Sequence, residues 1–434
     1  MKYILEQAKE LPVYASTDVL VIGGGVAGAA AALAAARNGS KAMVVERYGW
    51  LGGLATGGMV TVIEPYCNGA GKQLIGGIGY ELAERLNNAT GAPRGLMPEK
   101  EVINSDKQED IDKWRSWASV GWNDKRVRMV ENIHPEYAKH ELNQMLVEAG
   151  VEILLHTWVV EAVMEGERIA GVIIENKEGR SVILAKTVVD ATGDGDLLKW
   201  ANIPFTTDTR GTGLVYWVGN VDIDKALAAM KEDPVKFNEI MRAPHRSLYF
   251  MRTMVDGVVW FNNWFGKFDE LNVAELTKAE IDYRKLIVES IEHYRANLPG
   301  FENAQLVKVA PQLGIRLSRI LTGRKQVTKE SIYDHTHFDD VVALAGLDTK
   351  NDIYFEIPYG ALLPQRVDNL IAAGRFVSCD YYAQEYVRLI PCCLVTGEAA
   401  GTAAALAAQK NVAFADLDVG ELQACLRARG AILS

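Results

Sequence analysis

Cysteine is scarce in this sequence of 434 residues. Its five cysteines are Cys67, Cys379, Cys392, Cys393 and Cys425. A small and odd number of cysteines does not suit a disulfide framework and favours reduced thiols. We therefore expect a cytoplasmic location.

Long apolar runs and basic clusters are also missing. The start, MKYILEQAKELPVYA, has an apolar run of only three residues before Glu6, so we expect no signal peptide. We find no apolar stretch of 18 residues and expect no membrane span. The net charge of -10 and the absence of a Lys/Arg run argue against a nucleic-acid partner. With 49% apolar residues, the chain is long enough for two packed units that share a crevice.

Glycine, in contrast, is concentrated where a strand gives way to a helix. A strand at 17–22, a helix at 26–38 and a strand at 42–46 form a predicted βαβ unit. Further predicted elements are helices at 80–87, 134–149, 391–410 and 422–429 and strands at 152–155, 158–164, 168–176, 181–184, 187–191 and 370–373.

The turn of the βαβ unit, GGGVAG, fits the pattern GxGxxG. Gly23 permits the tight turn, Gly25 lets backbone amides approach a pyrophosphate, and Gly28 lets helix and strand pack closely. Glu46 follows Gly28 at the end of the second strand, where a carboxylate can accept hydrogen bonds from a ribose diol. Together these features predict a dinucleotide site.

Three further glycine turns occur far apart in the sequence. They are WLGGLATGG at 50–58, VVDATGDGD at 188–196 and NLIAAGRF at 369–376. Such turns can converge along one extended ligand, and FAD is longer than NAD. No second GxGxxG with an acid at the right distance is present, so we read no nicotinamide site.

Longer motifs carry a family resemblance. With PQLGIRLSRILTG at 311–323, IPYGALLP at 357–364 and VRLIPCCLVTGEAAGTAAALA at 387–407, the chain resembles FAD-dependent oxidoreductases of the glutathione-reductase-like superfamily, related to fumarate-reductase flavoproteins. The expected fold class is α/β. A discontinuous Rossmann-like FAD-binding domain, a parallel sheet with helices on its faces, takes 1–212 and 345–434, with a surface excursion at about 88–131. A second α+β substrate or capping domain takes 213–344.

The resemblance implies FAD as the cofactor and assigns residues to it. Val159 or Val160 would give the adenine a backbone contact, and the helix beginning near Cys392 would point its amides at the flavin. The implied cofactor-binding residues are Gly23, Gly25, Gly28, Glu46, Arg47, Gly53, Leu54, Ala55, Thr56, Val159, Val160, Ala191, Gly193, Asp194, Gly374, Arg375, Cys393, Val395 and Thr396.

Two arginines are candidates for substrate chemistry. Arg388 precedes the flavin-facing helix, and Arg316 lies three residues before Arg319. A cation near the flavin can bind a carboxylate substrate, or relay a proton as in the related fumarate reductases. The alternative is that these arginines pair with carboxylates of the chain or contact the cofactor.

Tyrosine and histidine supply two more candidates. Tyr382 can donate its phenol to a substrate, although core or rim packing is the commoner role of tyrosine. His337, with His335 in DHTHFDD, can act as an acid or base, or can simply belong to a polar loop. No third and fourth metal ligand is specified, so we expect no metal site.

The adjacent cysteines Cys392 and Cys393 occupy a helix start, a position that lowers a thiol pKa. They lack the place and spacing of a redox-active pair, and we interpret them as small residues near the flavin. The loop at 51–58 has no His or Cys, which argues against covalent flavin attachment there. The aromatic-rich segment 213–265 either caps the flavin or forms a second core.

These observations favour an FAD-dependent oxidoreductase. Its reaction would transfer a hydride between flavin N5 and a small organic substrate, possibly a carboxylate. The alternatives are a flavin-binding sensor without turnover and a flavoprotein acting on tRNA, against which the acidic charge argues. The expected partner is a small molecule, with neither nucleic acid nor membrane. The electron acceptor stays open, and a homo-oligomer is compatible with the sequence.

Overall fold

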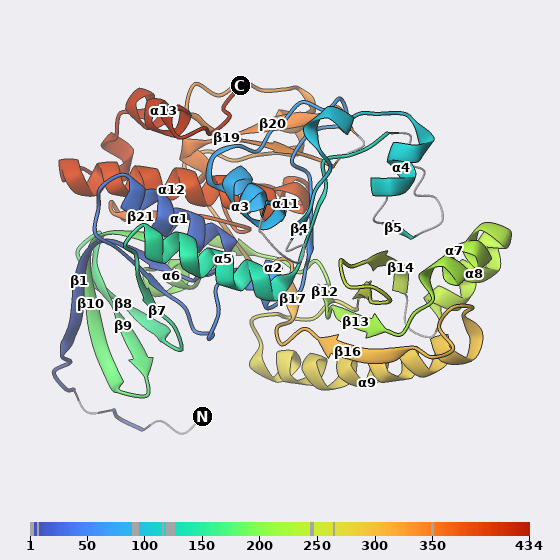
Figure 1. Ribbon diagram of the computed structural model, residues 1–434. Coiled ribbons are helices and arrows are strands. Elements are labelled where there is room, and N and C mark those ends of the chain that lie inside the picture. The colour runs from blue at the N-terminus through green and yellow to red at the C-terminus, as the bar shows by residue number, and fades with distance from the viewer. Residues whose placement is uncertain are drawn as a thin grey trace.

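A computed structural model gives the architecture (Figure 1). Of the predicted surface excursion at 88–131, residues 89–94, 115–116 and 119–125 lie outside the described part. The described residues are 4–6, 8–88, 95–114, 117–118, 126–243, 247–263, 265–348 and 351–434.

The main sheet has a parallel half, as the sequence analysis predicts. Its strands lie in the order β7 (Glu152–Leu154), β2 (Ala42–Val45), β1 (Val13–Ile22), β10 (Gly179–Asp190) and β21 (Leu370–Ala372). These strands are rich in buried β-branched residues, as is typical of strands covered on both faces. Their carboxyl ends therefore meet along one edge of the sheet.

An antiparallel meander extends the same sheet. β9 (Arg168–Asn176) pairs with the first half of β10, and β8 (Trp158–Glu165) pairs with β9. The predicted division of β10 into strands at 181–184 and 187–191 is wrong. The polar Lys186 between them is exposed, while the ladder to β1 continues on both sides of it, so the strand is unbroken.

Two apolar helices pack closely against each other and this sheet. They are α1 (Val26–Arg37) and α12 (Ile390–Lys410). A Cβ at Gly397 or Gly401 of α12 would overlap backbone atoms of α1, so glycine is required for this approach. Although no apolar stretch of 18 residues was expected, α12 is long and apolar enough to cross a membrane. However, 94% of its apolar 18-residue segment is buried inside the structure. It is a core helix.

A second unit lies beside the first (Figure 1). Its antiparallel sheet has the order β16 (Gln305–Val309), β13 (Tyr216–Gly219), β15 (Val259–Asn263), β14 (Ser247–Arg252) and β5 (Trp117–Ala118). Its fully buried aromatic rings stack on one another, as in the pair Tyr216 and Phe261 with ring centroids 5.0 Å apart. Most aromatics of the segment 213–265 thus form a core, the second of the two roles considered for them.

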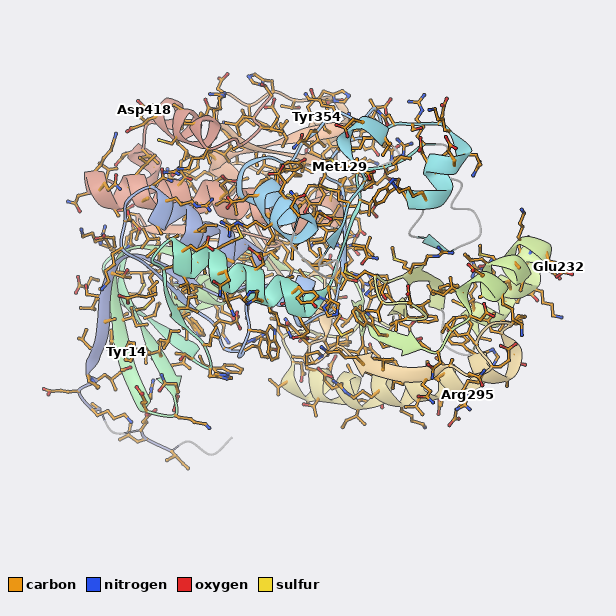
Figure 2. The ribbon with its side chains drawn as sticks, viewed as in Figure 1. Tyr14, Met129, Glu232, Arg295, Tyr354 and Asp418 are labelled. Atoms are coloured by element: carbon orange, nitrogen blue, oxygen red, sulfur yellow. The ribbon has the colours of Figure 1, made fainter. Side chains whose placement is uncertain are left out.

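The longest helix, α9 (Val273–Asn297), was not predicted. Its buried positions Ala279, Tyr283, Ile287 and Ile291 recur at a spacing of four, a signal that the mixed charges around them obscure. Arg295 near its end and Glu232 at the end of α7 (Ile223–Glu232) lie on the far side of the second unit from α12 (Figure 2).

The two units have separate hydrophobic cores. The larger core draws on residues 19–203 and 317–433, and the smaller on residues 59–62 and 214–313. The remaining elements are α2 (Gly53–Thr56), β3 (Val62–Ile63), α3 (Gly77–Asn87), β4 (Gly95–Leu96), α4 (Gln108–Trp114), β6 (Glu131–Ile133), α5 (Pro135–Glu148), α6 (Asp196–Trp200), β11 (Phe205–Thr207), β12 (Thr212–Gly213), α7 (Ile223–Glu232), α8 (Pro234–Arg242), β17 (Gly314–Ile315), β18 (Arg319–Leu321), α10 (Lys329–Tyr333), β19 (Val341–Gly346), β20 (Tyr354–Pro358), α11 (Tyr381–Val387) and α13 (Val419–Ala428).

Candidate functional site

The three glycines of GGGVAG are needed for three different reasons. Gly23 has φ +94°, and a Cβ there would lie 2.5 Å from the carbonyl oxygen of Ala191. A Cβ at Gly28 would overlap the carbonyl oxygen of Gly23. A Cβ at Gly25 would meet no protein atom within 4 Å. The protein itself therefore does not require glycine at position 25, and the open space there is left for a ligand.

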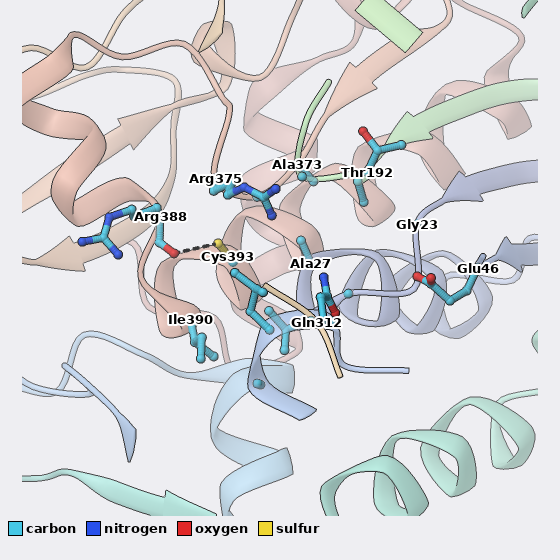
Figure 3. A pocket seen from close by; sticks show the side chains of 18 of the residues that line it. Gly23, Ala27, Glu46, Thr192, Gln312, Ala373, Arg375, Arg388, Ile390 and Cys393 are labelled. Carbon is cyan, nitrogen blue, oxygen red and sulfur yellow. Dashed lines mark hydrogen bonds between the residues drawn. The ribbon is translucent and has the colours of Figure 1, made fainter. Parts of the chain in front are cut away.

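That open space is part of a cavity that we call the glycine cavity (Figure 3). It runs along the carboxyl ends of the parallel strands and the N-terminus of α1, whose free amides attract an anion. Figure 3 shows Glu46 at one end of its lining and Arg388 at the other. The predicted cofactor residues that line it are Gly23, Gly25, Glu46, Arg47, Gly53, Leu54, Ala55, Ala191, Gly193, Gly374, Arg375 and Cys393.

Glu46 is held firmly in the wall of this cavity. Its two carboxylate oxygens accept hydrogen bonds from the backbone N–H groups of Gly24, at 2.6 Å, and Tyr48, at 2.9 Å. Burial nevertheless raises the pKa of the carboxyl group. Arg47 beside it lies over the rings of Tyr48 and Trp158, at 4.9 and 5.4 Å from their centroids.

Five predicted cofactor residues lie behind the lining and support it. Thr56 donates to the carbonyl of Leu51 at 2.5 Å and closes the second glycine loop. The hydroxyl of Thr396 accepts from the N–H of Gly374 at 3.2 Å and fixes that turn. The five residues are Gly28, Thr56, Asp194, Val395 and Thr396.

The structure does not bring Val159 or Val160 to the glycine cavity. Val160 borders a different, shallow surface hollow. The strand end that carries Glu46 is instead joined to the chain before β8, because the N–H of Thr157 donates to the carbonyl of Glu46 at 3.0 Å. The contact with the end of β2 thus lies two to three residues before Val159 and Val160, and the adenine contact of these two residues stays a prediction.

Gln312 lines the glycine cavity and was missed by the sequence reasoning. It comes from the smaller unit, just before β17, and its Oε1 is buried without a hydrogen-bond partner in the described part of the chain. The indole N–H of Trp50 is likewise unpartnered there, and both atoms lie close to Gly57. The one feature of the sequence that could have indicated Gln312 is its position in the family motif PQLGIRLSRILTG.

The N-terminus of α12 meets the same cavity. The helix starts one residue earlier than predicted, with Pro391 in its first turn, and it brings Ile390 and Cys393 to the lining. Burial raises the pKa of the Cys393 thiol to about 12 and that of Cys392 well above its usual value. The lowered thiol pKa expected at a helix start is therefore wrong here, because desolvation outweighs the helix dipole.

A second cavity, of about 380 Å³, adjoins the first. The two share the lining residues Leu54, Arg375, Arg388 and Ile390, so these side chains form a wall common to both. We call the second one the arginine cavity. Besides the shared residues, its lining is Val60, Val62, Glu64, Gly213, Val215, Trp260, Asn262, Gly314, Ile315, Arg316, Glu385 and Leu389, which come from both units.

Arg388 occupies the junction of the two cavities. Its guanidinium pairs with Glu385, and Glu385 also pairs with Arg210 at 2.7 Å. The Nε–H of Arg388 is buried and has no acceptor among the described residues. Burial lowers the pKa of Arg388, whereas Glu385 raises it. A group with a free hydrogen-bond acceptor would satisfy this donor.

Arg316 and Arg375 also line the arginine cavity. Arg316 is 8% exposed and donates to the carbonyl of Gly211 at 3.0 Å. Arg375 pairs with Asp194 at 2.6 Å, and that partner holds the pKa of Asp194 below its usual value against the effect of burial. Of the predicted catalytic residues, Arg388 and Arg316 thus reach a common cavity.

Tyr382 and His337, the other two predicted catalytic residues, do not reach this cavity. The phenol of Tyr382 lies 2.5 Å from that of Tyr333 near the surface, and the exposed His337 pairs with Glu356 at 3.0 Å, which raises the pKa of His337. Neither lines the glycine or the arginine cavity. Their catalytic roles stay predictions, and neither side chain reaches the cavity that Arg388 and Arg316 share. Within the described ranges, no group of three or more His, Cys, Asp or Glu side chains could hold a metal ion.

Comparison with known proteins gives a family for this arrangement. A family model described as FAD dependent oxidoreductase matches residues 18–426. No curated protein sequence matches the chain. A solved geranylgeranyl bacteriochlorophyll reductase-like protein of Thermoplasma acidophilum is 14% identical, with 96% of this chain and 84% of that chain covered and a TM-score of 0.47. Glycine oxidase of Bacillus cereus is 14% identical, with 96% and 98% covered and a TM-score of 0.43.

Proposed function

Because this chain belongs to the FAD-dependent oxidoreductase family, we propose that it transfers a hydride between FAD and a small organic carboxylate bound in the arginine cavity. The observation that carries the proposal is the shared wall of the two cavities, at which Arg388 presents a buried, unpartnered N–H. The proposal includes the kinship with fumarate-reductase-type flavoproteins that the sequence motifs suggest.

The residues of the glycine cavity fit FAD. The open space at Gly25 and the N-terminus of α1 suit a pyrophosphate, and the fixed carboxylate of Glu46 suits a ribose. The unpartnered amide oxygen of Gln312 and the N–H groups at the start of α12 suit the polar edge of the flavin. When bound, FAD supplies a ring that accepts or releases a hydride.

The protein's own part in the reaction is to bind and orient the substrate. Arg388 donates to a substrate oxygen, and Glu385 fixes the direction in which the guanidinium points. The apolar residues of the arginine cavity, such as Val62 and Trp260, exclude water around the bound molecule. The positive end of α12 favours negative charge at the junction of the cavities.

An anaerobic titration tests the proposal. Carboxylates are added to the FAD-loaded protein while flavin absorption is recorded, and we expect bleaching or a spectral shift with at least one of them. Arg388→Met should lower kcat/KM by at least about 100-fold while FAD stays bound, with partial recovery in Arg388→Lys. His337→Gln, outside both cavities, is the matched control. Undiminished turnover in Arg388→Met would contradict the proposal.

A further inference from the structure

The arginine cavity combines room for a ligand with an extensive apolar wall. Its volume of about 380 Å³ lies within the roughly 300–1,000 Å³ of a typical site for a drug-sized ligand. A substrate of a few carbon atoms would leave most of this space to water. The apolar part of the wall consists of Leu54, Val60, Val62, Val215, Trp260, Ile315, Leu389 and Ile390.

Trp260 offers this space only its ring. Its indole N–H already donates to the carbonyl of Met59 at 2.6 Å, and the residue is 2% exposed. The side chain therefore cannot turn its one polar group toward a ligand without losing a buried hydrogen bond. Its rigid ring surface, beside Val60 and Val62, suits a planar or branched apolar group.

Three arginines, Arg316, Arg375 and Arg388, line the wall of this cavity. Two of its arginines already have acid partners, Glu385 for Arg388 and Asp194 for Arg375. Glu64 adds another carboxyl group to the lining. The buried Nε–H groups of Arg388 and Arg375 both lack an acceptor in the described part of the chain, and both residues lie at the junction of the two cavities, so a carboxylate placed there meets two free donors.

We infer that the substrate is a carboxylic acid with a sizeable apolar body, aryl or branched alkyl, rather than a short polar acid. This inference rests on the proposed function. The carboxylate binds at Arg388, and the apolar body lies along Val60, Val62 and Trp260. Affinity then comes from the burial of the body, while Arg388 fixes which end faces the flavin.

The test measures binding of phenylpropanoate, acetate and succinate to the FAD-loaded protein from the change in flavin absorption, without oxygen. Phenylpropanoate should bind at least about tenfold more tightly than either short acid, because only it buries an apolar body. Val60→Phe, which fills the cavity, should weaken phenylpropanoate by about tenfold and leave acetate nearly unchanged. Val307→Phe, at a position 56% exposed on β16, is the control.

Thermal melting and FAD retention show whether Val60→Phe is folded. If it is not, Val62→Thr keeps the volume of the side chain but adds a hydroxyl, and it should weaken phenylpropanoate selectively. Equal or tighter binding of succinate would overturn the inference, as would equally tight binding of the uncharged phenylpropanol. If no acid of any size changes the flavin spectrum, the proposed function itself fails, which is a different result from a preference for short acids.

Discussion

The glycine cavity and the arginine cavity share a wall, yet they are built in different ways. The first is made largely of backbone, at turns where parallel strands end and helices begin. The second is made of side chains that two separate hydrophobic cores bring together. Backbone turns can bind a cofactor with little dependence on side chains, whereas the side chains between the units shape the adjoining cavity. Variants at each region can test this division.

The largest effects are expected within GGGVAG. Gly28→Ala should lower the free energy of unfolding by about 3 kcal/mol or more, because the new Cβ overlaps the backbone of Gly23. Gly25→Ala should cost the apoprotein at most about 1 kcal/mol, the difference between Gly and Ala at a helix N-cap. It should nevertheless weaken FAD binding by at least about 100-fold, since the Cβ enters the space for the pyrophosphate.

Urea unfolding of the apoproteins and FAD titration separate the two effects. Gly25, the N-cap residue, has φ −61°, which alanine adopts without strain. If Gly25→Ala failed to fold, backbone strain at this position would therefore not be the cause. Full FAD affinity in a folded Gly25→Ala would show that the open space beside this residue is not the pyrophosphate site.

An intermediate effect, on the pH dependence of stability, is expected from Glu131, which lies behind the wall of the arginine cavity. Glu131 on β6 is fully buried, pairs with the Tyr66 hydroxyl at 2.7 Å, and lies next to β3, which carries Val62. Burial raises the pKa of Glu131 from its usual 4.5 to about 7. Because the folded-state pKa is the higher one, the stability that this group contributes is complete below about pH 4.5 and is lost as the pH rises toward about 7.

The wild-type free energy of unfolding should therefore fall between about pH 5.5 and about pH 8, and Glu131→Gln should reduce that fall by about 2 kcal/mol. Urea denaturation at the two pH values measures it. Asp190, Glu270 and Glu398 have pKa values raised to about 7 in the same way, so some pH dependence should remain in the variant. An unchanged pH dependence in Glu131→Gln would show that Glu131 is ionised in the folded protein.

The smallest effect is expected where the two regions touch. Gln312 brings the smaller unit to the glycine cavity with an unpartnered amide oxygen. Gln312→Leu should weaken FAD binding about fivefold, the effect of one lost hydrogen bond, and shift the flavin reduction potential. Gln305→Leu, at an exposed position on β16, should change neither. Equal effects of the two variants would show that Gln312 does not contact the cofactor.

The parallel half of the main sheet was predictable from local patterns. The strands ending at Ile22 and Val45 and the helix that begins at Val26 follow from runs of apolar residues and from glycine spacing, both of which act over a few residues. β10 was predicted as two strands because Lys186 breaks the apolar run, although the neighbouring strand keeps the ladder intact. α9 was missed because its buried positions are separated by charged residues.

The site was predictable to a similar degree. Most of the lining of the glycine cavity follows from its glycine turns, since their backbone conformation is specified locally. Tyr382 and His337 have suitable chemistry, but packing turns both away from the cavities. Gln312 has no distinctive local pattern, and only the contact between the two units brings it to the cofactor side.

The glycine turn GGGVAG, its acid Glu46 and the strands on either side follow from local sequence patterns, because each depends on residues close together in the chain. That Arg388, Val62, Trp260 and Arg316 surround one space emerges from the folded structure alone. Those four belong to segments far apart in sequence, and their meeting depends on how two cores pack against each other, which no local preference of the chain encodes.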